Sequence, residues 1–165
     1  MKPSWDSYFL TICFLAAQRS IDQSTKHGCC AVDNENTLLG IGYNGPIRGS
    51  DDTKVPQERP AKYAYFIHSE ENLIITSAKN GVSLKNSTFY ITGHPCTTCF
   101  RMIKQVGAKR IVYGMVGSAC VDENAKKIIN EMNSHNPIQI DYITKEQDGV
   151  ISLLNQTIEY YNKKA

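Results

Sequence analysis

The order of apolar segments constrains the fold of this chain more than any other feature of its sequence. Two short apolar runs, Gly28–Val32 and Leu38–Tyr43, flank a polar turn at 33–36 and predict a β-hairpin. Helical and strand patterns then alternate to the end of the sequence. A hairpin followed by such an alternation predicts an α/β fold with one mixed sheet of about five strands, flanked by helices.

The boundaries of the expected elements follow from apolar periodicity, capping residues and glycines. A first helix is expected from Ser4 to Ser20, with Ser4 as its N-cap. The segment 47–64 is rich in glycine, proline and charge, and long loops of this kind in compact domains are usually functional or mobile. Later helices are expected over 69–79, 96–106, 122–132 and 145–161, and later strands over 88–92, 110–114 and 138–142.

The apolar stretch near the N-terminus has two interpretations, a signal peptide or the first helix of the domain. Asp6 and Thr11 interrupt the apolar run, and its apolar residues recur at three- and four-residue steps. These residues are Trp5, Phe9, Ile12, Cys13, Ala16 and Ala17. No segment approaches the roughly 18 apolar residues of a membrane span. We therefore expect one cytoplasmic domain covering residues 1–165, without a membrane partner.

The charge of the chain argues against a protein dedicated to binding polynucleotides. Eighteen Lys and Arg residues stand against sixteen Asp and Glu residues, and the cations are scattered along the sequence. Proteins that track a nucleic-acid strand usually carry a basic stripe or an aromatic-lined channel. We therefore expect no polynucleotide partner.

Two short motifs carry the chemistry, His68-Ser69-Glu70 and Pro95-Cys96-Thr97-Thr98-Cys99. The Cys-x-x-Cys motif places two thiols on one turn at a predicted helix N-terminus, where backbone N–H groups favour the thiolates that zinc needs. With His68 as a third ligand, the fourth tetrahedral position is left for water, as in catalytic zinc sites. The motifs predict one Zn²⁺ per chain on His68, Cys96 and Cys99.

Glu70 is the predicted proton shuttle of this site. Zinc lowers the pKa of a bound water to about 7. Hydroxide attack on C4 of a cytosine then requires one proton for N3 and one for the departing ammonia. Glu70 can transfer both if it lies beside the water rather than on the metal. A His-x-Glu motif followed by Pro-Cys-x-x-Cys is the signature of zinc deaminases that act on nucleobases.

Other uses of these motifs remain open. A lone Cys-x-x-Cys also occurs in redox proteins and in structural zinc sites, although thioredoxin-like cues are missing and only His94 stands near enough to be a fourth ligand. The other cysteines are expected to be reduced structural residues. Cys29 and Cys30 would point to opposite faces of a strand, so they cannot share one ion. The remaining two are Cys13 and Cys120.

Beyond these motifs, the sequence resembles the deoxycytidylate (dCMP) deaminases of the cytidine-deaminase-like superfamily. The zinc motif identifies the superfamily, and Gly-Tyr-Asn-Gly at 42–45 with Gly-Ser-Asp-Asp at 49–52 points to the dCMP branch. The C-terminal third matches only in its rhythm of strands and helices. The resembling segments are 5–9, 16–20, 40–45, 49–52, 62–65, 68–72 and 95–99.

The resemblance implies a three-layer α/β/α sandwich and hydrolytic deamination of dCMP to dUMP and ammonia, which supplies dUMP for thymidylate synthesis. It implies the same zinc ligands and the same role for Glu70. Substrate contacts are expected from Asn44, Tyr65, Ser69 and Pro95. Ser69 replaces the family's usual alanine, a small change that should keep the geometry. Some members carry a second, structural zinc before the His-x-Glu motif, but the segment between Asn44 and His68 has no Cys or His, so we expect none.

The resemblance also implies a homohexamer that is activated by dCTP and inhibited by dTTP. The paired aspartates at 51 and 52 would repel a bare triphosphate but could hold Mg²⁺ coordinated to it. The expected regulatory site consists of Asn44, Gly45, Asp51, Asp52, Asn72 and Lys79.

Two other function classes stay open at this point. The first is another deaminase of the superfamily, acting on free cytidine or deoxycytidine, on a polynucleotide base or in riboflavin synthesis. Cations before the zinc motif favour a phosphorylated substrate, although loop charges are often merely solvated. These cations are Arg48, Lys54, Arg59 and Lys62. The second class is a non-catalytic module that binds zinc or nucleotides, which would have no need of Glu70.

Overall fold

A five-stranded mixed sheet forms the centre of the protein. The computed structural model describes residues 2–114, 122–144 and 149–164. The strand order is β2-β1-β5-β6-β7; β1 runs antiparallel to β2 and β5, whereas β5, β6 and β7 run parallel. The predicted hairpin and strands are confirmed to within one residue at either end. The strands are β1 (Gly28–Val32), β2 (Leu38–Tyr43), β5 (Thr88–Ile91), β6 (Arg110–Tyr113) and β7 (Gln139–Tyr142).

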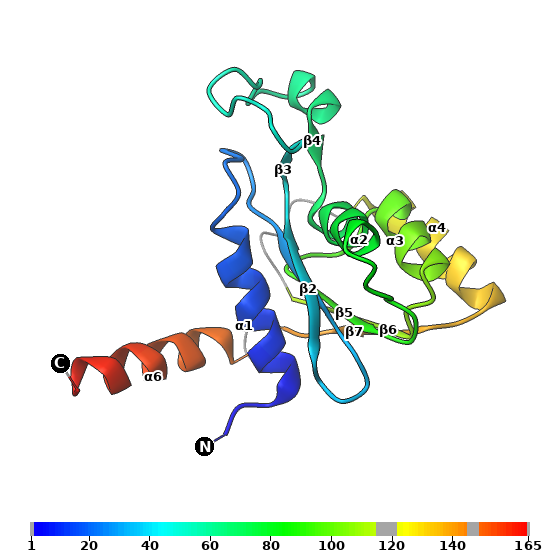
Figure 1. Cartoon of the computed structure of the whole chain (residues 1–165). Coiled ribbons are helices and arrows are strands. Elements are labelled where there is room, and N and C mark those ends of the chain that lie inside the picture. Colours follow the sequence, from blue (N-terminus) through cyan, green and yellow to red (C-terminus); the bar gives the residue numbers. More distant parts are fainter. Residues whose placement is uncertain (1, 115–121, 145–148, 165) are drawn as a thin grey trace.

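Helices cover both faces of this sheet, and the predicted three-layer α/β/α fold is confirmed (Figure 1). One face carries α2 (Ser69–Lys79), α3 (Thr97–Gln105) and α4 (Glu123–His135). The other face carries α1 (Trp5–Ala17) and α6 (Val150–Asn162). None of the described helices has the length and apolar character needed to cross a lipid bilayer.

Each face of the sheet has its own hydrophobic core because side chains alternate along a strand. Phe89 and Ile91 pack with α2, α3 and α4, while Tyr90 packs with α1 and α6. The expected separation of Cys29 and Cys30 is confirmed, since they belong to the two different cores. Cys13 is also fully buried, as expected.

The structure corrects the end of the first helix and the expected burial of Trp5. The first helix ends at Ala17 rather than Ser20, because Ser20 turns to accept a hydrogen bond from the backbone N–H of Asp22. Trp5, expected on the apolar face of this helix, is 49% exposed. The described part of the last helix begins at Val150, after Gly149 in a left-handed conformation (φ 63°). The predicted start at 145 and Cys120 lie outside the described residues.

The segment 47–64, predicted as a loop, contains one short helix and is flanked by two short strands. β3 (Gly45–Pro46) pairs antiparallel with β4 (Phe66–Ile67), and a 3₁₀ helix, η1 (Ala61–Ala64), precedes β4. Together with the connecting residues, they form a small lobe that projects from one end of the sheet, where Figure 1 shows it in cyan and green. The run from 47 to 60 contains no further helix or strand.

Gly42 allows the zinc motif to lie close to the sheet. A Cβ atom at this position would lie 2.2 Å from the carbonyl oxygen of Ser69, so only glycine lets α2 approach β2 this closely. Gly28 does the same for α1, because a Cβ atom there would lie 2.0 Å from the carbonyl oxygen of Cys13. The first turn of α2 is therefore fixed against the sheet at the level of β2's last residues.

Candidate active site and metal centre

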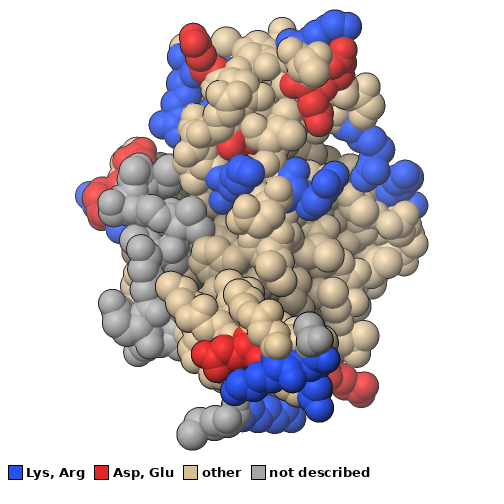
Figure 2. All heavy atoms as spheres, turned by 90° about the vertical axis from the view of Figure 1, so that its left-hand side faces the viewer, with Lys and Arg blue, Asp and Glu red and all other residues tan. Residues whose placement is uncertain are grey.

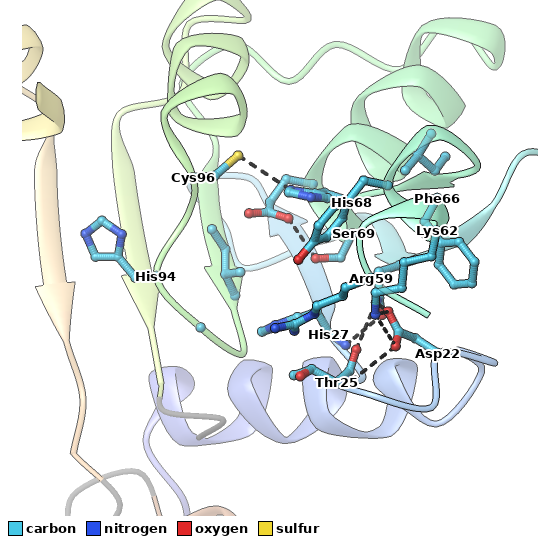
Figure 3. Close-up of a pocket in the computed structure, with 16 residues that line it drawn as sticks. Asp22, Thr25, His27, Arg59, Lys62, Phe66, His68, Ser69, His94 and Cys96 are labelled. Atoms are coloured by element: carbon cyan, nitrogen blue, oxygen red, sulfur yellow. Dashed lines mark hydrogen bonds and ion pairs between the residues drawn. The ribbon is translucent and has the colours of Figure 1, made fainter. Parts of the chain in front are cut away.

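The three predicted metal ligands meet where two helices begin. His68 is the N-cap residue of α2 and Cys96 is the N-cap residue of α3. The His68 ring makes no capping hydrogen bond to α2 and points toward α3 (Figure 3). Cys96 accepts a hydrogen bond from the backbone N–H of Cys99 at 3.4 Å. The two helix starts thus bring the His68 ring together with two thiols that lie 28 and 31 residues later in the sequence.

The distances between the donor atoms suit one tetrahedral zinc ion. Nδ1 of His68 lies 3.5 Å from Sγ of Cys96 and 3.5 Å from Sγ of Cys99, and all three atoms lie within 4.8 Å of one another. A tetrahedral ion with ordinary Zn–S and Zn–N bonds would separate its sulfur and nitrogen ligands by about 3.6 Å. The donor set therefore fits a three-ligand zinc site.

The electrostatics of the cluster favour a negatively charged sulfur. Hydrogen bonds from Cys99 and His68 stabilise the Cys96 thiolate and lower the pKa of Cys96 to about 3. The hydrogen bond between His68 and Cys96 also raises the pKa of His68 to about 9. The pKa of Cys99 is raised by its contact with Cys96 and by burial. A thiolate is the form of cysteine that binds zinc, so the chemistry of the donors agrees with their geometry.

Glu70 lies beside this donor set without belonging to it. Its side chain is buried, and its Oε2 accepts a hydrogen bond of 2.8 Å from the Ser69 hydroxyl. Burial raises the pKa of Glu70 above its ordinary value, because a charged carboxylate is poorly solvated there. A carboxyl group with a raised pKa exchanges protons more readily near neutral pH. An alanine at position 69 could not make this contact with Glu70.

A cavity of about 450 Å³ extends away from these groups (Figure 3). Its metal end is lined by His68, Ser69, Glu70 and Cys96. His27 and His94 also line the cavity; the His27 ring contacts the Thr92 hydroxyl at 3.2 Å, and burial lowers the pKa of His27, which favours the neutral ring. The far end is lined by polar and aromatic residues. These are Asp22, Thr25, Asn44, Arg59, Lys62 and Tyr63.

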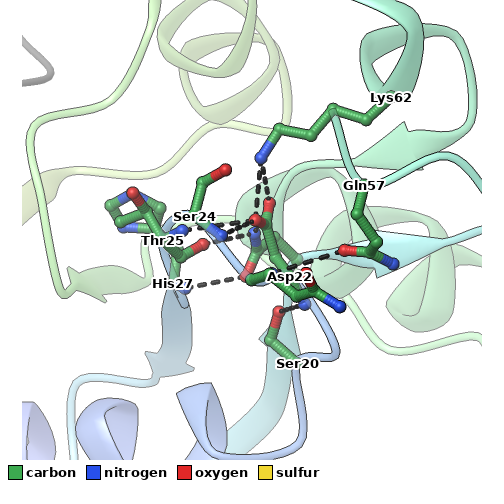
Figure 4. Close-up of polar contacts among 9 residues, drawn as sticks. Ser20, Asp22, Ser24, Thr25, His27, Gln57 and Lys62 are labelled. Atoms are coloured by element: carbon green, nitrogen blue, oxygen red, sulfur yellow. Dashed lines mark hydrogen bonds and ion pairs between the residues drawn. The ribbon is translucent and has the colours of Figure 1, made fainter. Parts of the chain in front are cut away.

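A buried polar network forms the wall of that far end (Figure 4). Nζ of Lys62 lies 2.7 and 2.8 Å from the two carboxylate oxygens of Asp22, and both side chains are nearly inaccessible to solvent. The amide of Asn44 donates to Asp22 and to the carbonyl of Thr25, and its oxygen accepts from the backbone N–H of His27. These contacts join the segment after α1 to the end of β2 and to η1.

The expected substrate residues fall into two groups. Asn44 and Ser69 line the cavity, but the Asn44 amide is already engaged in the polar network. Tyr65 is 49% exposed, and neither Tyr65 nor Pro95 is among the described residues that line the cavity.

The expected regulatory residues are not brought together within the described part of one chain. Asn72 donates to the carbonyl of Tyr43 and so lies next to Asn44 and Gly45. Lys79 lies at the other end of α2, an eleven-residue helix whose ends are about 15 Å apart. Gly42 lies beside the start of α2 and Gly40 beside Ser77, which places Lys79 toward the hairpin tip. Asp51 and Asp52 are exposed in the projecting lobe.

Several cavity residues were missed by sequence reasoning. Asp22, Thr25 and His27 follow the first helix in an irregular segment that carries no motif or periodicity. Lys62 was noticed as one of four cations and at the start of a resembling segment, but nothing in the sequence indicates that its partner lies forty residues earlier. For His27, the sequence offered one indication of a place in the site, which is its position directly before the buried strand that begins at Gly28.

Comparisons with known proteins agree with this geometry. The family model described as "Cytidine and deoxycytidylate deaminase zinc-binding region" matches residues 3–115. Deoxycytidylate deaminase of Mus musculus is 39% identical over 115 residues, covering 66% of this chain and 64% of the mouse protein. A probable deoxycytidylate deaminase of Caenorhabditis elegans is 33% identical over 147 residues, covering 87% of this chain and 72% of that protein.

A solved structure shares the fold of this chain. The dCMP deaminase from the cyanophage S-TIM5, in complex with dCMP and dUMP, superposes with a TM-score of 0.72 at 23% identity. The superposition covers 87% of this chain and 99% of the phage protein. The chain spans a smaller share, 64%, of the vertebrate relatives it matches.

Proposed function

This chain belongs to the cytidine and deoxycytidylate deaminase family, and we propose that it hydrolyses dCMP to dUMP and ammonia with a zinc ion held by His68, Cys96 and Cys99. One observation carries the proposal. A zinc-compatible donor set and a buried glutamate share one cavity, whose opposite end is polar and contains cationic side chains. Such a cavity suits a base that reacts at one end and a phosphate that binds at the other.

The chemistry of the proposed reaction replaces the C4–N bond of cytosine by a C4–O bond. Zinc at this site would act as a Lewis acid that makes water more acidic. Glu70 would take one proton from the attacking water and deliver it to N3. It would then take the second proton from the new C4 hydroxyl and deliver it to the amine, which departs as ammonia. The Ser69 hydroxyl would hold the Glu70 carboxyl in place through the hydrogen bond at Oε2.

The face of the protein seen in Figure 2 favours a mononucleotide over a polynucleotide substrate. Figure 2 shows Lys and Arg side chains in separate groups on one face of the protein, interrupted by acidic and uncharged residues. A strand-tracking protein needs a continuous cationic path. The relatives named deoxycytidylate deaminase and the phage enzyme seen with dCMP point to the same substrate class.

A substrate panel tests the proposal directly. Purified zinc-loaded protein is assayed for ammonia release from cytidine, deoxycytidine, dCMP, dCTP and a single-stranded oligodeoxynucleotide. We expect dCMP to have the highest kcat/KM. A preference for either nucleoside or for the oligonucleotide would refute the substrate assignment. No turnover of any compound would favour a non-catalytic binding module.

The proposed regulation requires more than one chain. We propose that dCTP activates and dTTP inhibits by competing for a site in which Asn44, Gly45 and Asn72 of one subunit meet Lys79 of another in a homo-oligomer, with a hexamer favoured. Asp51 and Asp52 would bind Mg²⁺ coordinated to the triphosphate. Two triphosphates can regulate in opposite directions only if they prefer different states of the enzyme. Activity at fixed dCMP, titrated with each triphosphate and Mg²⁺, tests this, and an unchanged rate with both would reject it.

We also propose that residues 1–165 act as one deaminase domain in the cytoplasm. The support is the five-stranded sheet that both halves of the sequence build and the free state of the described cysteines. Reduced thiols are typical of cytoplasmic proteins.

A further inference from the structure

Among the described residues that line the cavity, Arg59 is the Lys or Arg side chain that is still available to a ligand. We propose that Arg59 binds the 5′-phosphate of the substrate and thereby sets the preference for nucleotides over nucleosides. The inference rests on the proposed function, because it assigns a residue to the phosphate of dCMP. Of the four cations that precede the zinc motif, it assigns phosphate binding to Arg59 alone.

Two of the four cations do not line the cavity. Arg48 and Lys54 are exposed in the projecting lobe. Lys54 also pairs with Asp51, with 2.8 Å between its Nζ and the carboxylate. Neither residue is placed to contact a ligand whose base lies at the metal end.

Lys62 lines the cavity, but its charge is already neutralised. Its ammonium group is bound by both oxygens of Asp22, and the side chains of the pair are only 4% and 6% exposed. Using Lys62 to hold a phosphate would bring the dianion close to the Asp22 carboxylate. The pair is therefore better suited to hold the wall of the cavity than to attract an anion.

Arg59 lines the same end of the cavity and remains exposed. Among the described residues it has no ion-pair partner, and its guanidinium carbon lies 6.0 Å from the centre of the Tyr63 ring. An arginine over an aromatic face is held in place while its N–H groups stay free to donate. In Figure 3, Arg59 lies near Lys62 and Asp22, on the opposite side of the cavity from Cys96.

The chemistry of arginine suits this role. A guanidinium group donates two parallel hydrogen bonds to a phosphate, which fixes both its position and its orientation. With Asp22 and Lys62 cancelling each other, Arg59 leaves this end of the cavity with a positive charge. A nucleoside lacks the 5′-phosphate that Arg59 would bind, so Arg59 would add nothing to the binding of a nucleoside.

The test compares Arg59→Gln with Arg48→Gln, a matched change of an exposed arginine in the same lobe that does not line the cavity. The zinc-loaded proteins are assayed with dCMP and with deoxycytidine. A hydrogen-bonded charge pair corresponds to about 10- to 100-fold in binding, so Arg59→Gln should lower kcat/KM for dCMP by that factor and leave deoxycytidine unchanged. Arg59→Lys should restore part of the loss, because it keeps the charge but not the paired donors. Arg48→Gln should behave as the wild type.

Binding of dUMP and deoxyuridine, measured by calorimetry, gives a readout that does not depend on turnover. Arg59→Gln should weaken dUMP binding by the same factor and leave deoxyuridine binding as it is. Equal losses for both ligands would show that Arg59 only supports the fold of the cavity, and unchanged dUMP binding would assign the phosphate to another group. If the wild type binds dUMP but deaminates no substrate, the proposed function fails while the assignment of Arg59 is still decided by binding.

Discussion

The two ends of the cavity are built in different ways. At the metal end, His68, Glu70 and Cys96 lie in or directly before the first turns of α2 and α3, and each belongs to a short motif. At the far end, Asp22, Arg59 and Lys62 come from irregular chain and from a single 3₁₀ turn. The reacting groups are held by regular elements, whereas the groups proposed to recognise the substrate are held by contacts between distant segments.

The two ends of the cavity therefore depend on different features of the protein. The metal end needs particular atoms, since zinc is held only by suitable donor atoms, here one nitrogen and two sulfurs, at tetrahedral distances. The far end needs a particular arrangement, since one buried ion pair and one amide join three segments. Changes at the metal end should therefore affect chemistry first, and changes at the far end should affect stability and substrate preference.

The largest effect is expected from removing a metal ligand. His68→Ala should lose zinc and reduce dCMP turnover to the background rate, because two thiolates alone leave the ion poorly held. Zinc content and ammonia release measure this. His135→Ala, at the end of α4, should retain both. Full activity of His68→Ala would contradict the expectation that changes at the metal end affect the chemistry first.

A loss of chemistry without loss of metal is expected from Glu70→Gln. The variant keeps the shape of the side chain but cannot carry the proton, so kcat should fall by about 10²- to 10⁴-fold with zinc retained. Glu71→Gln is the matched control, because Glu71 is the neighbouring carboxylate and does not line the cavity. A change confined to KM would make Glu70 a binding residue instead.

At the far end, Asp22→Asn should cost stability. Removing one partner of a buried ion pair leaves the Lys62 ammonium uncompensated, which typically destabilises a protein by about 3–5 kcal/mol. Urea unfolding of the zinc-loaded protein gives the value. Asp51→Asn removes the partner of Lys54 in an exposed pair and should leave the free energy of unfolding nearly unchanged. Equal effects of the two changes would contradict the structural role of the buried pair.

A smaller effect should appear on acidification. Burial alone would raise the pKa of Asp22, but hydrogen bonds from Lys62 and the backbone outweigh it and hold the pKa below its ordinary value. The carboxylate therefore stabilises the folded protein fully above about pH 4, and this contribution is lost as the pH falls through the lowered pKa. The difference in unfolding free energy between wild type and Asp22→Asn should shrink below pH 4. A constant difference would mean that Asp22 does not titrate with folding.

The sequence predicted the metal end better than the far end, and the reason is physical. Cys96 and Cys99 are three residues apart, and a helix start holds such a pair together whatever surrounds it. The strands were recognisable because buried runs such as Thr88–Ile91 are continuous and apolar. These are local properties, so they can be derived from neighbouring residues.

The far end depends on tertiary contacts that leave no local trace. Asp22 stands between Ile21 and Gln23 in no recognisable pattern, and its partner Lys62 lies in a segment predicted only as a loop. The end of the first helix was misplaced for the same reason, because the turn at Ser20 serves the position of Asp22. The contact between Ser69 and Glu70 also escaped prediction, since a serine for alanine change looks neutral in sequence.

The most direct measurement is a zinc titration of chelator-treated protein with dCMP deamination as the readout. One ion per chain on His68, Cys96 and Cys99 predicts activity that rises in proportion to added zinc and reaches its plateau at one equivalent. Under the same conditions Glu70→Gln should bind one equivalent of zinc and keep its strongly reduced kcat. Turnover by the metal-free protein, or a plateau at two equivalents, would contradict the account.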